Sequence, residues 1–177
     1  MDKFGFIREK LDIKILILFI LRRLPDEIDE GKLSSLIFID DGINYFDYME
    51  CLTELEKTGH ITIRDGRYKI TPKGDRNGAA IESSIPYSVR AKAERASLEL
   101  ASSMRRNAMI EASHVIDENG SPVIALSLSD GMGEILSLHL LASGEEEAKI
   151  IEGNFRLDAE RIYNKIVEIL LDENGES

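Results

Sequence analysis

Residues 60–71 carry the strongest local structural signal in this sequence, the dipeptide Asp65-Gly66. Asp-Gly readily takes the left-handed backbone conformations of a two-residue hairpin turn. Alternating side chains precede it at 60–64 and follow it at 67–71, as is typical of two short strands. The sequence therefore predicts an antiparallel hairpin over residues 60–71.

Three helices are predicted before this hairpin. Residues 7–24 carry apolar side chains on almost every helical face, which indicates a buried helix that ends before Pro25. A second helix, about 30–38, leads into a tight turn at Asp40-Asp41-Gly42. A third is capped by Asn44 and ends at Thr58-Gly59. The inner face of this third helix is predicted to contain Tyr45, Met49, Leu52 and Leu55.

This order of elements is that of a winged helix-turn-helix, which we expect over residues 1–82. Residues 83–106 follow as a linker helix, because no glycine or proline occurs between Pro86 and Arg106. Small and apolar residues recur along it at spacings of four, three and four. This spacing suits pairing with a second copy in a homodimer, or packing on the chain's own domain. The residues concerned are Val89, Ala93, Ala96 and Leu100.

The last third, residues 107–177, is predicted to be a small α+β domain. Its strands alternate and are joined by glycine-containing loops, which favours a three-stranded antiparallel sheet. Two helices that follow can cover one face of this sheet, so the whole chain is α+β. The strands are expected at 110–116, 123–129 and 135–141, and the helices at 145–151 and 158–171.

A register can be proposed for this sheet. If Ile116 faces Ile124 and Leu126 faces Leu138, most of the apolar side chains fall on a single face, which the helices would cover. That face would contain Ile110, Ala112, His114, Leu126, Leu128, Leu136 and Leu140.

Charge is unevenly distributed along the chain. Residues 1–56 have a net charge of −6, residues 57–106 of +6 and residues 107–177 of −11. The overall −11 argues against a general affinity for polyanions, but the basic middle could face a phosphate backbone. The longest apolar run, 15–21, is far shorter than the roughly 20 residues of a membrane span. With no secretory signal at the N-terminus, we expect a cytoplasmic protein without a membrane partner.

No catalytic, metal or cofactor site is predicted. Cys51 is the only cysteine, so no intramolecular disulfide forms, and no Cys and His have zinc-ligand spacing. His60, His114 and His139 fall in no motif that pairs a base with a nucleophile. An enzyme is therefore not expected.

Double-stranded DNA is the expected partner. Cationic side chains flank the hairpin turn and continue after it, where they could bind phosphates. These are Arg64, Arg67, Lys69, Lys73 and Arg76. Base contacts would come from the start of the third helix, at Asn44, Tyr45 and Tyr48.

The same helix carries Asp47, Glu50 and Glu54 at positions predicted to face outward, where they would repel phosphate. The alternative is therefore a winged helix that contacts another protein and does not bind DNA. A small-molecule effector in the C-terminal domain is suggested only by the common pairing of a sensor domain with a DNA-binding domain.

Several segments resemble an uncharacterised family of bacterial winged-helix proteins, described as a domain of unknown function. They are 12–18 in the first helix, Asn44-Tyr45-Phe46, 52–55 with Gly59-His60-Ile61, 68–74 and 85–90. The resemblance covers nearly the whole chain and includes the Thr-x-x-Gly pattern of Thr71 to Gly74, which winged helices share. It implies a DNA-binding domain followed by a family-specific C-terminal domain, in a transcriptional regulator without enzyme activity.

Overall fold

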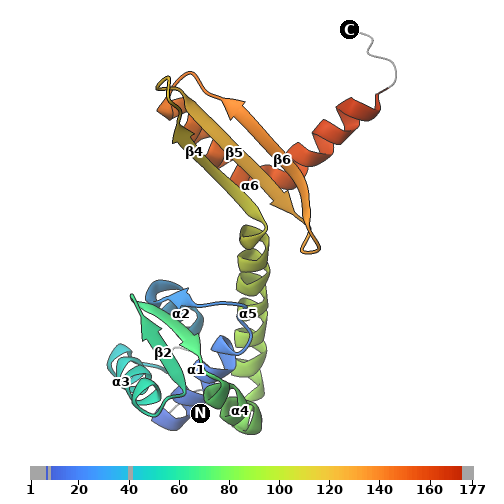
Figure 1. Cartoon of the computed structure of the whole chain (residues 1–177). Coiled ribbons are helices and arrows are strands. Elements are labelled where there is room, and N and C mark those ends of the chain that lie inside the picture. The colour runs from blue at the N-terminus through green and yellow to red at the C-terminus, as the bar shows by residue number, and fades with distance from the viewer. Residues whose placement is uncertain (1–6, 8, 40–41, 173–177) are drawn as a thin grey trace. The chain divides into compact units, whose positions relative to one another are not determined.

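The structure is a computed structural model, which describes residues 7, 9–39 and 42–172 (Figure 1). These residues form six α-helices, a short 3-10 helix and two three-stranded antiparallel sheets, so the chain is α+β as predicted. It divides into two compact units, Met1–Met104 and Arg105–Ser177, and the expected linker helix therefore belongs mostly to the first. Asp40 and Asp41 of the expected tight turn lie outside the described residues.

In its described residues, the first unit contains five α-helices, a 3-10 helix and one sheet. Its elements are α1 (Lys10–Leu21), β1 (Ile28–Asp29), α2 (Glu30–Ile37), α3 (Tyr45–Lys57), β2 (Ile61–Arg64), β3 (Arg67–Ile70), α4 (Pro72–Ile81), the 3-10 helix Glu82–Ser84 and α5 (Tyr87–Ala108). The first helix is shorter than the predicted 7–24. After Leu21 the backbone N–H groups of Arg23 and Leu24 bond three residues back, which tightens the chain into a turn before Pro25.

Helix α1 is the centre of the first unit's core. Every residue from Ile15 to Leu21 is buried, as its all-round apolar sequence predicts. Helices α2 and α3 begin where side chains cap them, since the Asp29 carboxylate accepts from the Lys32 N–H and the Asn44 amide oxygen from the Asp47 N–H.

The predicted hairpin forms as β2 and β3. Asp65 and Gly66 both have positive φ, 49° and 72°, as a two-residue turn of this type requires. Strand β1 was not predicted, because two residues are too few to show an alternating pattern. It pairs with β3, and the sheet order is β1-β3-β2.

Helix α4 was also not predicted, and it corrects the interpretation of the basic residues after the hairpin. Thr71 caps it by accepting from the Gly74 N–H, and Pro72 is its first residue. A Cβ on Gly74 would lie 2.0 Å from the carbonyl oxygen of His60, so only glycine lets α4 approach β2 this closely. The Thr-x-x-Gly pattern therefore combines a helix cap with a close contact.

Helix α5 packs on the first unit. Val89 and Ala93 are buried in that unit's core, and Ala96 and Leu100 pack against it. These four residues of α5 therefore pack on the chain's own first unit. This is one of the two alternatives that the sequence left open.

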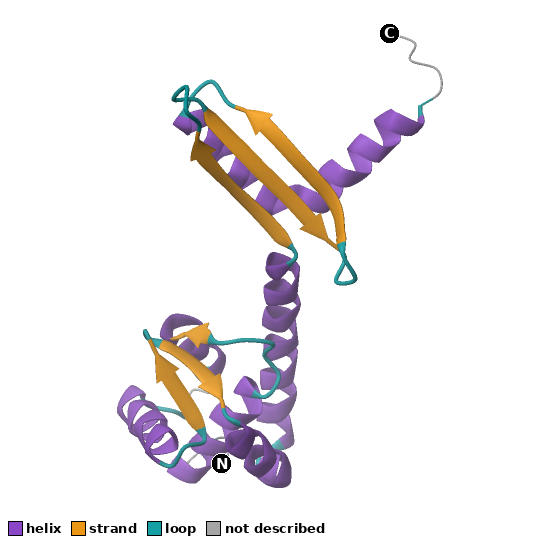
Figure 2. Ribbon diagram, in the orientation of Figure 1, coloured by secondary structure: helices purple, strands orange, loops and turns teal. Residues whose placement is uncertain are grey.

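The second unit is a three-stranded sheet with one long helix beneath it (Figure 2). Its elements are β4 (Ile110–Ile116), β5 (Pro122–Ser129), β6 (Glu134–Leu141) and α6 (Glu145–Leu171). Helix α6 merges the two predicted helices, with a break at Asp158, where φ is −136° and ψ is 26°. Phe155 lies just before the break and is fully buried against the sheet.

The proposed register is right for one strand pair and wrong for the other. Leu126 faces Leu138 as predicted, but Ile116 faces Pro122 instead of Ile124. The error is two residues, and because side chains alternate with a period of two, the same residues still share the inner face. Ile110, Ala112 and Leu128 are accordingly buried.

Candidate nucleic-acid interface

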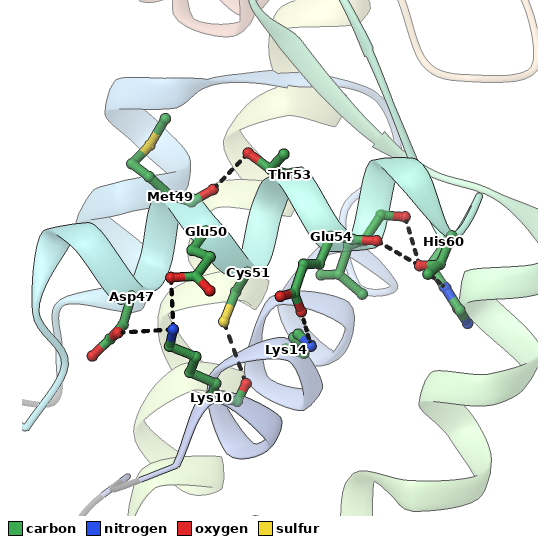
Figure 3. Close-up of polar contacts among 11 residues, drawn as sticks. Lys10, Lys14, Asp47, Met49, Glu50, Cys51, Thr53, Glu54 and His60 are labelled. Carbon is green, nitrogen blue, oxygen red and sulfur yellow. Dashed lines mark hydrogen bonds and ion pairs between the residues drawn. The ribbon is translucent and has the colours of Figure 1, made fainter.

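Three acidic residues of α3, Asp47, Glu50 and Glu54, are paired with lysines of α1 (Figure 3). Lys10 Nζ lies 2.6 Å from a Glu50 carboxylate oxygen and 3.6 Å from one of Asp47. Lys14 forms an ion pair with Glu54 and lowers the pKa of that carboxyl group. Two lysines of α1 therefore offset part of the negative charge that the sequence placed on the outward face of α3.

Tyr48 does not lie on the surface of α3. Its side chain is fully buried, and this burial raises the pKa of its hydroxyl group. Among the described residues that hydroxyl has no hydrogen-bond partner. The stripe Tyr48, Cys51, Leu52 and Leu55 is the true inner face of α3, whereas Tyr45 is 52% exposed. Spacings of three, one and three would have identified this stripe from the sequence.

The other candidates at the start of α3 are exposed but differ in what they can contact. The Asn44 amide is engaged on both sides, since its oxygen accepts from the Asp47 N–H and its nitrogen donates to the Asp47 carboxylate. Tyr45 packs beside Phe38, with ring centroids 6.4 Å apart. Phe46, which the sequence reasoning did not select, is 84% exposed and is the most prominent side chain of this region.

Two arginines lie directly opposite each other at the hairpin tip. Arg64 faces Arg67 in the β2–β3 register, so their side chains emerge on the same face of the sheet. Arg67 Nε lies 3.7 Å from Glu27, whereas Arg64 has no ion pair within the described part of the chain. Lys69 Nζ, two residues on, lies 2.8 Å from Asp26 and lowers the pKa of that carboxyl group.

Lys73 and Arg76 do not extend this cluster. They lie on α4, which follows the end of β3 remote from the turn. Lys73 Nζ donates to the Thr58 carbonyl at the end of α3, at 2.7 Å, and Arg76 is exposed. The basic run in the sequence is therefore divided between the hairpin tip and α4.

His60 joins α3, β2 and α4. Its Nδ1 lies 2.8 Å from the Thr58 hydroxyl and its Nε2 lies 2.9 Å from the Asn77 amide nitrogen. Burial, with a smaller effect from Lys73, lowers the pKa of the imidazole. This histidine is a structural link between three elements. A cavity of about 410 Å³ lies beside it, with mainly apolar walls from α1, α3 and α4.

A half-buried polar pair lies between the sheet and the helix of the second unit. His114 lies on the inner sheet face, as predicted, with Nδ1 2.5 Å from a carboxylate oxygen of Glu152 on α6. The described residues include no group of three or more His, Cys, Asp or Glu side chains that could hold a metal ion. They also include no helix with the length and apolar character needed to cross a membrane.

The fold and this surface define a two-unit α+β chain with a basic hairpin tip on its first unit. The chain belongs to the family described as "Domain of unknown function (DUF4364)", whose model matches residues 13–170. Neither the curated proteins nor the solved structures contain a match to the chain.

Proposed function

We propose that the chain is a DNA-binding transcriptional regulator of the winged-helix type, in which β2 and β3 are the wing. The observation that carries this proposal is the Arg64–Arg67 pair at the tip. Like charges directly opposite each other destabilise a sheet. A phosphate between the two guanidinium groups would turn that repulsion into two charge-assisted hydrogen bonds.

The element order supports the same proposal. Helices α1, α2 and α3 precede a hairpin whose second strand also pairs with the short β1, which holds the wing against the helices. In this class of domain the third helix enters the major groove and the wing lies near the backbone. On α3 the exposed residues Tyr45, Thr53 and Lys57 would then contact DNA.

The ion pairs on the wing do not prevent such contact. Arg67 and its partner Glu27 are 53% and 37% exposed, and Lys69 and Asp26 are 53% and 65% exposed. Exposed ion pairs contribute little to stability, because water and salt screen them. A phosphate can therefore replace the carboxylates at little energetic expense.

The test compares two double variants in binding to a fluorescent mixed-sequence duplex at low salt. Arg64→Ala with Arg67→Ala is expected to weaken binding to all sequences, by about tenfold or more. Lys92→Ala with Arg95→Ala removes the same charge from exposed positions of α5 and should leave the affinity almost unchanged. If the two double variants lose the same amount of duplex affinity, or if neither loses any, the assignment of the wing is wrong.

A protein-interaction module is the second candidate, and one observation favours it. Phe46 is 84% exposed at the start of α3, and an exposed aromatic side chain is a frequent anchor of protein interfaces. If DNA binding is absent at low salt, capture of a partner by the wild type but not by Phe46→Ala would support this function instead.

A further inference from the structure

Strand β6 is an unprotected edge of the second unit's sheet. It is eight residues long, contains no proline and pairs with β5 alone among the described strands. Edge strands that must not associate usually carry lysines, prolines or inward charges. The charged or titratable side chains of β6 are only Glu134, at its first position, and His139. Nothing in its sequence opposes the addition of another strand.

The inner face of β6 also lacks the cover that the other two strands have. Helix α6 packs against β4 and β5, where Ile124 and Leu126 are buried. On this face Leu136 and Leu138 are only partly buried against the core, and Leu140 is 40% exposed. On the opposite face of the strand, Leu141 is 72% exposed. One third of the sheet is therefore without a full hydrophobic partner.

The end of α6 carries a second apolar surface, which none of the described residues covers. After the break at Asp158 the helix passes β6 and extends beyond that edge of the sheet (Figures 1 and 2). Its last residues, Ile169, Leu170 and Leu171, are 67%, 77% and 73% exposed. Consecutive exposed apolar residues indicate a contact surface, because a monomer gains nothing from them.

We propose that β6 pairs antiparallel with β6 of a second copy of this chain, around a twofold axis at Leu138. The two sheets then form one six-stranded sheet, and the end of each α6 lies beneath the partner's β6. In this register Leu136 faces the partner's Leu140, Ile135 faces the partner's Leu141 and Ser137 faces the partner's His139. The proposal concerns the second unit and is independent of DNA binding by the first.

The sequence of β6 selects this register. Centred on His139, the pairing would place two imidazoles opposite each other and Ser137 opposite a leucine. Centred on Ser137, it would place Ile135 opposite a histidine. Only the centre at Leu138 sets apolar residues against apolar ones and a hydroxyl against an imidazole. Side chains keep their faces under such a twofold axis, so both α6 helices lie on the same side of the joined sheet.

Charge also favours a second copy over a basic partner. Residues 107–177 carry 15 acidic and 4 basic side chains, but β6 carries a single carboxylate, at its end. A basic protein would be attracted to the acidic surfaces elsewhere on this unit. Two copies can meet at β6 with few charges in contact, and their mutual repulsion then falls as salt screens it.

The first test measures molar mass by light scattering of the full chain. The wild type should have about twice the 19.9 kDa of one chain and associate more tightly as salt rises. Leu141→Lys should return it to one chain's mass, while Val115→Lys, at a 67% exposed position of the opposite edge strand, should leave the dimer intact. A monomeric wild type, a dimer unaffected by Leu141→Lys, or dissociation by both variants would overturn the proposal.

The second test fixes the register by disulfide formation, and Cys51 does not interfere because it is buried. Directly opposite residues have Cα atoms about 4.5–5.5 Å apart, within the roughly 4.4–6.8 Å of a disulfide, whereas diagonal neighbours are about 7–8 Å apart. A mixture of Ser137→Cys and His139→Cys chains should form a mixed disulfide on mild oxidation. Neither variant alone should cross-link efficiently, and cross-linking of Ser137→Cys with itself in preference to the mixture would refute this register.

Discussion

Gly74→Ala tests the close contact between α4 and the start of β2. The added Cβ would meet the His60 carbonyl oxygen at 2.0 Å and its carbonyl carbon at 2.9 Å. Both are backbone atoms, held by the hydrogen bond from the Thr71 N–H to the same oxygen, so they cannot swing away as a side chain could. Helix α4 would have to move from β2.

The size of the effect follows from two opposing contributions. Alanine in place of glycine favours a helix by roughly 0.5–1 kcal/mol. Overpacking costs about 1–3 kcal/mol, and a backbone clash belongs at the upper end of that range. We expect a net loss of about 2 kcal/mol, which corresponds to an unfolding equilibrium constant about 30-fold larger.

Labelling of Cys51 measures this opening specifically in the first unit. The thiol is buried and its pKa is raised to about 11 by that burial, so a thiol reagent reacts only when the unit opens. Labelling of Gly74→Ala should be about 30-fold faster than that of the wild type under conditions of rapid reclosing. Gly31→Ala is the matched control, because its Cβ would meet only a side-chain oxygen at 3.4 Å. Equal labelling of Gly74→Ala and Gly31→Ala would show that the close approach at Gly74 does not limit the stability of the first unit.

Three further predictions concern stability. Phe155→Ala should destabilise the second unit by about 3–5 kcal/mol in denaturant titrations, because its side chain is fully buried, and a loss below 1 kcal/mol would show that the core does not depend on it. Asn44→Ala should cost about 1 kcal/mol and Asn44→Ser much less, since a serine hydroxyl can also accept the Asp47 N–H; equal losses would argue against the cap. Burial lowers the pKa of His60 below 6.5, so the unfolded chain takes up the proton first and stability should fall as pH drops from about 7 to 5. His60→Gln should reduce this pH dependence. If the free energy of unfolding of the variant changes with pH as steeply as that of the wild type, His60 is not its cause.

The sequence predicted the elements whose signals are local. The Asp65-Gly66 turn, the Asn44 cap and the strands of the second unit all follow from short patterns that specify a backbone conformation. Helix α4 was missed although Thr71-Pro72 is a start signal, because residues 73–80 contain almost no apolar periodicity. Its close packing depends on the missing side chain of Gly74, and a glycine does not contribute to the apolar periodicity by which helices are predicted.

The candidate site was harder to predict, because it depends on contacts between elements. Two apolar stripes fit α3 from the sequence, and choosing the one with Tyr45 and Met49 put Tyr48 on the wrong side. The acidic residues of α3 were assigned to solvent because their partners, Lys10 and Lys14, lie on α1, about 40 residues earlier in the chain. The basic run after the hairpin was divided by the unpredicted helix α4.

The salt dependence of duplex binding tests the proposed function most directly. For the full-length wild type, the logarithm of the association constant should fall steeply and linearly with the logarithm of salt concentration. Replacing Arg64 and Arg67 together by alanine should reduce the magnitude of that slope by about 1.8, since each phosphate contact contributes about 0.9. No binding at the lowest salt, or a slope that the double variant leaves unchanged, would contradict a DNA-contacting wing.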